Sequence, residues 1–251
     1  MVLSHRTAIR VSGLAGVAGA VCWTPGDPLI VGAHATIADY PLLMRDYAGR
    51  IAFGALAETL SSSEPRLASG ALVANVAIPL YLLGSWHFYR GILPGGKILA
   101  AIVFALLVCG NAWSPLGHAA FYFIAMVYKT VMLAPEAAHG ALLDLGTQFH
   151  RVLTIAWLLP VMTLALAMLL LAVAVARGGT YYPRWAAAVL NPVSLMAIGV
   201  GLPYAVPEPL KTWLHGAGIN IGWLFAYAFS TALLWTAPMS RRADQPPPGS
   251  A

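Results

Sequence analysis

The sequence predicts an all-α fold, a polytopic transmembrane helical bundle with six spans. Of the 251 residues, 59% are hydrophobic and only 9% are charged, whereas soluble domains average about 25% charged residues. The mean hydropathy is +0.75, and the apolar residues gather in runs long enough to cross a ~30 Å bilayer core. A soluble fold of this length could not hide so much apolar surface, so lipid must cover part of it.

The six spans are predicted to form a single domain over residues 1–238. Their expected ranges are 8–24, 67–89, 98–127, 152–176, 185–206 and 213–236. The first apolar run mimics a secretory signal, but the later spans favour an uncleaved helix. Its small residues recur every four positions, as in Ser12 and Gly16, and this spacing lets a neighbouring helix approach closely.

The third and fifth runs carry prolines that bear on their predicted structure. The third run, from Ile98 to Tyr128, is longer than one span needs and contains Pro115 between two glycines. We therefore expect a kink or a break near Pro115. The fifth run carries Pro192 and Pro203.

The segment 25–66 is too polar to span as a whole, and we expect it to form an outward-facing cap. Within it, Ile51–Leu60 is apolar except for Glu58. Ten helical residues cover about half of a ~30 Å core. This piece is predicted to be an interfacial or re-entrant helix, with a seventh full span as the alternative.

The distribution of basic residues predicts the orientation. Lys and Arg are enriched in cytoplasmic loops, so we expect both termini on the cytoplasmic side of a bacterial inner membrane. The basic residues placed inside are Arg6, Arg10, Arg90, Lys97, Arg177, Arg184, Arg241 and Arg242. The tail 239–251, with three consecutive prolines, is predicted to be disordered.

Composition and motifs exclude several classes of function. The basic residues flank apolar runs and form no nucleic-acid motif, so no nucleic-acid partner is expected. Cys22 and Cys109 are interpreted as packing residues. The seven histidines are too scattered for a metal site, no His-Glu-x-x-His is present, and no cofactor is assigned.

Polar residues that fall toward the outer half are the candidates for chemistry, because ionisable groups at bilayer depth are costly. Three are predicted to be catalytic: Asp27, Glu58 and His118. Four are predicted to bind substrate: Tyr122, Asn220, Trp113 and Asn111. Four of these residues also have a structural interpretation. Asp27 can be a turn residue, Glu58 can face water on an amphipathic helix, His118 can be a packing histidine, and Asn220 can join two helices.

A second polar group lies toward the inner face. His87, Arg90 and Lys97 follow the second span, and Arg184 precedes the fifth. They are predicted to contact anionic lipid headgroups. The alternative is anchoring at the interface, together with the nearby Trp and Tyr residues.

The order of several motifs resembles an uncharacterised bacterial family of multi-pass membrane proteins, a domain of unknown function. These motifs are Gly26-Asp27, Trp86–Gly91 with Gly95-Gly96, Gly117–Phe121, Tyr181–Trp185 and Gly218–Gly222. The resemblance runs from about Gly13 to Trp235. It implies no activity, but it singles out the polar residues of these motifs. The size and carboxyl groups are also loosely similar to small integral-membrane terpene cyclases and sterol isomerases, an analogy of architecture only.

The first functional hypothesis is an intramembrane acid–base enzyme, of cyclase or isomerase type, acting on an isoprenoid or lipid. The alternatives are a non-catalytic protein that binds or transports a lipid or small molecule, and a structural membrane subunit. The expected partners are membrane lipids and a hydrophobic small molecule. The oligomeric state is left open.

Overall fold

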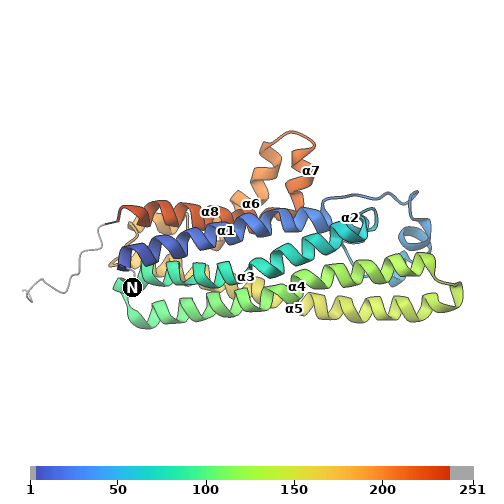
Figure 1. Cartoon of the computed structure of the whole chain (residues 1–251), viewed down its shortest axis with the longest axis horizontal. Helices are drawn as coiled ribbons and strands as arrows, with labels where there is room; N and C mark the ends of the chain where they lie inside the picture. The colour runs from blue at the N-terminus through green and yellow to red at the C-terminus, as the bar shows by residue number, and fades with distance from the viewer. Residues whose placement is uncertain (1–3, 238–251) are drawn as a thin grey trace, which may run out of the picture.

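The computed structural model describes residues 4–237, and this part of the chain contains helices and no strand (Figure 1). Five helices are long and apolar enough to cross a membrane. They are α1 (His5–Val31), α3 (Glu64–Ile92), α4 (Lys97–Leu133), α5 (Glu136–Arg177) and α8 (Gly218–Trp235). The prediction of an all-α transmembrane bundle is confirmed.

Shorter elements connect these helices. Before α3 lie η1 (Leu42–Asp46), η2 (Ala48–Arg50) and α2 (Leu56–Leu60), and η3 (Leu93–Gly95) joins α3 to α4. Between α5 and α8 lie η4 (Arg184–Ala188), α6 (Pro192–Gly201), η5 (Leu202–Ala205), α7 (Leu210–Leu214) and η6 (His215–Ala217).

The helices are arranged as a ring. Helix α1 packs against α3 and α8, α3 packs against α4, α4 packs against α5, and α8 packs against α6. Glycines permit the closest approaches. A Cβ atom added at Gly84 of α3 would lie 2.7 Å from the Cα of Gly16 in α1 and 2.8 Å from the Tyr227 ring of α8. The predicted small-residue face of the first helix is therefore an interface between three helices.

Helices α4 and α5 are far longer than their predicted spans. At about 1.5 Å per residue, their 37 and 42 residues correspond to ~56 Å and ~63 Å, about twice the ~30 Å core. Of the kink or break expected at Pro115, the break is wrong, because α4 is continuous through this residue; the kink stays a prediction. Transmembrane helices tolerate proline where neighbouring groups satisfy the freed backbone.

The cap differs in its limits from the prediction of 25–66. Residues 25–31 belong to α1, which continues through Pro25 and Pro28. The predicted half-helix Ile51–Leu60 is helical only from Leu56, so neither the longer helix nor the seventh span forms there. Instead Phe53, Leu56 and Leu60 pack on the distal parts of α4 and α5. The cap is thus a small packed layer over the ends of two long helices.

The predicted span 185–206 is not one helix. It consists of η4, α6 and η5, and only the ten residues of α6 are α-helical. After α6 the chain leaves the side of the bundle as a hairpin that contains α7 (Figure 1), and it returns at Gly218 to begin α8. The prolines at 192 and 203 start these short elements, because proline suits the first turn of a helix.

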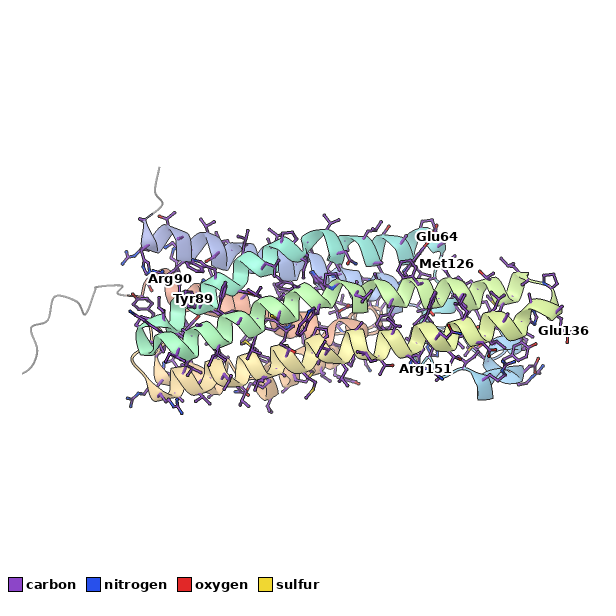
Figure 2. All side chains as sticks on the ribbon, turned by 90° about the horizontal axis from the view of Figure 1, so that it is seen from below. Glu64, Tyr89, Arg90, Met126, Glu136 and Arg151 are labelled. Atoms are coloured by element: carbon purple, nitrogen blue, oxygen red, sulfur yellow. The ribbon has the colours of Figure 1, made fainter. Side chains whose placement is uncertain are left out.

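The two ends of the bundle differ in charge. Arg90 lies at one end and Glu136 at the other (Figure 2). Arg10 in α1 donates hydrogen bonds of 3.2 and 2.6 Å to the carbonyl of Trp235 in α8, so the first and last described helices meet at the end with Arg90. We call this the basic end and the opposite one the cap end. The predicted tail 239–251 lies outside the described residues.

Candidate functional site

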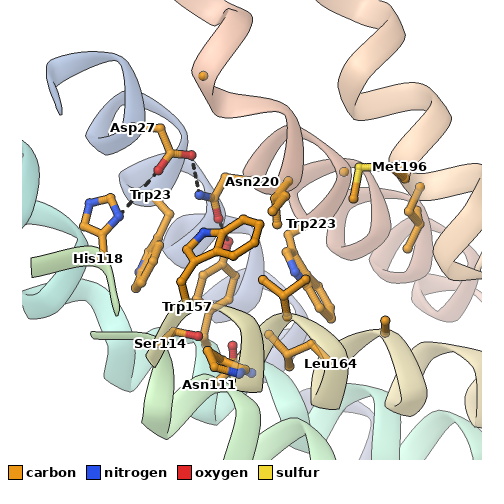
Figure 3. A pocket seen from close by; sticks show the side chains of 18 of the residues that line it. Trp23, Asp27, Asn111, Ser114, His118, Trp157, Leu164, Met196, Asn220 and Trp223 are labelled. Carbon is orange, nitrogen blue, oxygen red and sulfur yellow. Dashed lines mark hydrogen bonds and ion pairs between the residues drawn. The ribbon is translucent and has the colours of Figure 1, made fainter. Parts of the chain in front are cut away.

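A cavity of about 300 Å³ lies inside the ring of helices (Figure 3). Its walls come from α1, α3, α4, α5, α6, η6 and α8. The volume is at the lower end of the range for small-molecule sites. Most of the lining is apolar. Asp27, His118 and Asn220 lie together on one side of the cavity, whereas the polar residues Asn111 and Ser114 lie on another (Figure 3).

Asp27 is the centre of a chain of polar contacts. The side-chain amide of Asn220 in α8 donates a hydrogen bond of 2.6 Å to Asp27 Oδ2. Tyr81 of α3 donates a longer hydrogen bond of 3.4 Å to Asn220 Oδ1. Asn220 and Tyr81 are both buried. Three helices thus contribute to holding one carboxyl group in a fixed position.

His118 of α4 faces the other carboxyl oxygen. Its Nδ1 lies 3.5 Å from Asp27 Oδ1, and its Nε2 donates a hydrogen bond of 3.1 Å to the carbonyl of Gly70. A carbonyl can only accept, so Nε2 carries a hydrogen and a neutral ring has a bare Nδ1. A carboxylate facing a bare nitrogen is repulsive. The pair is therefore complementary when one further proton lies on either Asp27 or His118.

Glycines bring these groups together. Gly26 precedes Asp27, and a Cβ atom there would lie 3.3 Å from the carbonyl of Gly70. A Cβ atom at Gly70 would lie only 2.8 Å from the carbonyl of Gly26. Helices α1 and α3 cross closely at this point, which places the Gly70 carbonyl within reach of His118. Gly117, one residue before His118, would clash at 2.6 Å with the Ala156 carbonyl of α5 if it carried a Cβ atom.

The rest of the cavity is aromatic and aliphatic. Trp23 stands beside His118 with their ring centroids 4.9 Å apart, and Trp157 and Trp223 complete the aromatic wall (Figure 3). The indole nitrogen of Trp23 is buried and has no hydrogen-bond partner within residues 4–237. A buried unpaired donor costs about 1–3 kcal/mol, and burial also keeps this N–H off the open surface of the cavity.

This arrangement suits proton transfer more than metal binding. Within the described part of the chain, no three side chains of His, Cys, Asp or Glu come close enough to hold a metal ion. Asp27 and His118 face each other across 3.5 Å in a mostly apolar cavity. General acid–base catalysis needs such a positioned donor and acceptor beside the substrate.

Four of the residues predicted from sequence line the same cavity: Asp27, His118, Asn220 and Asn111. Asn111 donates a hydrogen bond of 3.2 Å to Ser85 Oγ. Asn220 does join two helices, as its structural interpretation holds, but the group it binds is the carboxyl of Asp27.

Three other predicted site residues lie elsewhere. Glu58 is in the cap on α2 and does not line the cavity, so it is not the acid–base partner of Asp27. Tyr122 points outward and donates a hydrogen bond of 2.9 Å to Glu64. Trp113 is 44% exposed on the outer face of α4. The spacing of these residues along the sequence does not show which of them face the cavity and which face outward from α4.

At the basic end, the prediction for His87 is wrong. His87 is fully buried, with Nδ1 donating a hydrogen bond of 2.9 Å to the carbonyl of Ile9 and Nε2 lying 2.8 Å from Ser230 Oγ. Ser230 is also 2.7 Å from the hydroxyl of Tyr182. Burial raises the pKa of Tyr182, which therefore remains a donor. These residues form a buried polar lock between α1, α3, α8 and the segment after α5.

The three cations predicted with His87 do lie at the surface of the basic end. Arg90 is 5.5 Å from the centre of the Trp86 ring, Lys97 begins α4, and Arg184 donates a hydrogen bond of 3.3 Å to the carbonyl of Arg177. Contact with lipid headgroups at these positions stays a prediction.

Sequence reasoning missed several cavity residues. Tyr81, Trp23 and Trp157 sit in apolar runs where an aromatic residue gives no signal of its own. Glycines inside the apolar runs were the available signal, because Gly26, Gly70 and Gly117 lie where the helices around the site cross closely.

The fold and the site define a class of protein, a polytopic helical membrane protein with a polar-sided cavity inside its bundle. The chain matches the model of the family of unknown function DUF6796 over residues 5–237 and belongs to that family. This agrees with the resemblance to a domain of unknown function. No curated protein and no solved structure matches the chain.

Proposed function

We propose that this protein is an intramembrane acid–base enzyme, of isomerase or cyclase type, that acts on an apolar small molecule. The observation that carries the proposal is the Asp27–His118 pair inside an apolar cavity, with one proton to share between two groups. Asn220 fixes the orientation of the carboxyl group. The aromatic wall suits an unsaturated hydrocarbon such as an isoprenoid or sterol, because ring faces attract developing positive charge.

The proposed reaction is balanced in protons. The protonated member of the pair gives its proton to one carbon of a double bond. The other member, or the same one after reorientation, takes a proton from a neighbouring carbon. The double bond moves or a ring closes, and a proton passed back between Asp27 and His118, where they have exchanged roles, returns the enzyme to its starting state. No oxidant, reductant or metal is required.

Deuterium incorporation tests the proposal while the substrate is still unidentified. The purified protein is reconstituted with a total lipid extract from its host membrane and incubated in D₂O. The lipids are then extracted through H₂O and analysed by mass spectrometry. Hydrogens on oxygen and nitrogen exchange back, whereas a deuterium delivered to carbon remains. We expect one lipid class to gain one mass unit per turnover.

The variants separate the site from the rest of the chain. Asp27→Asn keeps the size of the side chain but cannot transfer the proton, and we expect turnover to fall by ~10²–10⁴-fold. His118→Gln should behave similarly. Glu58→Gln is the matched control, because this carboxyl group lies outside the cavity, and it should keep full turnover. No labelled lipid with the native protein, or full turnover in Asp27→Asn, would remove the proposal.

Binding or transport without chemistry is the second candidate, and one observation favours it. The chain is interrupted between α6 and α8 beside the cavity, and transporters often bind their substrates at interrupted helices. A lipid that co-purifies unchanged, with no deuterium on carbon, would support this function. The proposal of a structural subunit has no comparable support.

We also propose six membrane crossings, with η4 and α6 together as the interrupted fifth, and both termini on the cytoplasmic side of a bacterial inner membrane. Support comes from Arg10 reaching Trp235 and from the surplus of cations at the basic end.

A further inference from the structure

The ring of helices has one weak seam, between α5 and α6. The other neighbouring helices in the ring pack extensively, whereas α5 and α6 barely touch, and α5 and α8 touch even less. Only near the basic end does η4 bridge this gap by packing against α5. The seam is weak because α6 has only ten residues and is followed by the hairpin.

The cavity extends to this seam. Its lining includes one face of α5, from Trp157 to Met168, and Pro192, Leu195 and Met196 of α6. Two of these lining residues are also substantially exposed, Trp157 at 42% and Met196 at 44%. Figure 3 shows Trp157 and Met196 projecting from α5 and α6 on two sides of the pocket. A residue that both lines the cavity and is exposed marks where the cavity opens.

The medium outside the seam is hydrocarbon. The adjoining outer surface of α5 is exposed and apolar, as at Met162 and Leu166, and Val193 of α6 is 77% exposed. These residues belong to the part of the chain that would be surrounded by acyl chains. An opening at this position therefore connects the cavity with the bilayer.

The polar side of the cavity lies near the boundary of the hydrocarbon layer. From Lys97, which starts α4, to His118 is 21 residues, or ~32 Å of helix, close to the ~30 Å thickness of the core. The hairpin beyond α6 carries Tyr204 and Trp213 on its surface, as is typical of residues at a membrane interface. Asp27 and His118 thus lie at headgroup depth, and the apolar walls extend toward the bilayer centre.

We propose that the α5–α6 seam is a lateral portal, through which a membrane-dissolved amphipathic lipid enters. Its polar group and the double bond beside that group lie at the Asp27–His118 pair, and the rest of its hydrocarbon chain lies along α5 and α6. This inference deepens the proposed function and rests on it only for what happens to the ligand once bound.

The test measures which medium reaches the inner wall of the cavity. Ser114 of α4 lines the cavity, so Ser114→Cys is labelled with bimane in a Cys22→Ala, Cys109→Ala background. The labelled protein is reconstituted in vesicles of phosphatidylcholine carrying bromines at mid-chain. We expect strong quenching by the brominated chains and little quenching by aqueous iodide. Stronger quenching by iodide would show a water-filled entrance, and quenching by neither would show a closed cavity; each overturns the proposal.

Two labelled positions calibrate the response. Leu116 is 59% exposed on the outer face of α4, so Leu116→Cys reports direct contact with lipid. Asp144, whose side chain is 70% exposed near the cap, reports contact with water when changed to Cys. If Ser114→Cys does not fold, Ile219→Cys in α8, which also lines the cavity, serves the same purpose.

Blocking the seam gives a second arm. Ala165→Trp adds a large side chain on the α5 side of the opening, and we expect it to remove most of the chain quenching at position 114 and none at 116. Unchanged quenching at 114 would contradict entry by this route. Quenching requires no chemistry, so the portal can stand if Asp27→Asn retains turnover, and it can fail while the proposed enzyme function survives.

Discussion

The close crossing of α1 and α3 can be tested with one methyl group. In Gly84→Ala, the new Cβ atom would lie 2.7 Å from the Cα of Gly16 and 2.8 Å from the ring of Tyr227. Real Cβ atoms essentially never make such contacts, and the first partner is backbone, which cannot rotate away. The two helices must separate, and overpacking of this kind costs about 1–3 kcal/mol.

The intrinsic preference of a helix for alanine over glycine acts in the opposite direction, by about 0.5–1 kcal/mol. Gly140→Ala in α5 is the matched control, because a Cβ atom at Gly140 has nothing within 4 Å. In the control, the substitution changes the free energy of unfolding through the helix preference alone, without a clash. The difference between the two variants therefore isolates the clash, and it should be about 1–3 kcal/mol in favour of Gly140→Ala.

The measurement is thermal unfolding in detergent, followed by tryptophan fluorescence or by a thiol-reactive dye. For a domain of this size, 1 kcal/mol corresponds to roughly 2–4 °C, so Gly84→Ala should melt on the order of 2–12 °C below Gly140→Ala. Equal melting temperatures would mean that α1 and α3 do not approach this closely, and they would contradict the tight crossing at Gly16 and Gly84.

Further predictions concern the polar lock and the orientation. Ser230→Ala leaves Tyr182 and His87 without their shared partner and should lower the melting temperature, because each buried unpaired group costs about 1–3 kcal/mol. The neighbouring Thr231→Val removes a hydroxyl that is already unpaired and should be neutral or stabilising; the reverse order would contradict the assigned contacts. A reporter fused after Ala251 should be cytoplasmic, and a periplasmic signal would refute the orientation.

The helical membrane class and most of the spans could be predicted from the sequence, because hydrophobic runs need no tertiary information. The exact helix limits could not. Helix α1 continues to Val31 although Asp27 sits within it, since Asn220 and His118 from other helices compensate the carboxyl group. The hydropathy of a short stretch of sequence does not reveal contacts with other helices. Judged by that stretch alone, the span ends at residue 24.

The candidate site was predictable in part for the same reason. Polar residues in apolar runs drew attention to Asp27, His118 and Asn220, and the structure brings these together. Glu58 gave the same local signal but lies in the cap. His87 was misinterpreted because Arg90 is close in sequence. Its helical face is instead shared with Gly84 and Gly91, and such small neighbours indicate a tightly packed interior.

The unusual length of α4 and α5 has a mechanical consequence. Beyond His118 and Trp157 both helices continue without interruption into the layer formed by the cap, where Arg50 pairs with Asp144 and Tyr47 contacts His139. His118, the α5 wall of the cavity and the outermost layer are therefore carried on the same two long helices, whereas Asp27 belongs to α1. A molecule that binds the cap and tilts it would therefore also move His118 and the α5 wall of the cavity. Binding in the aqueous phase would in this way change the surroundings of a ligand held in the membrane.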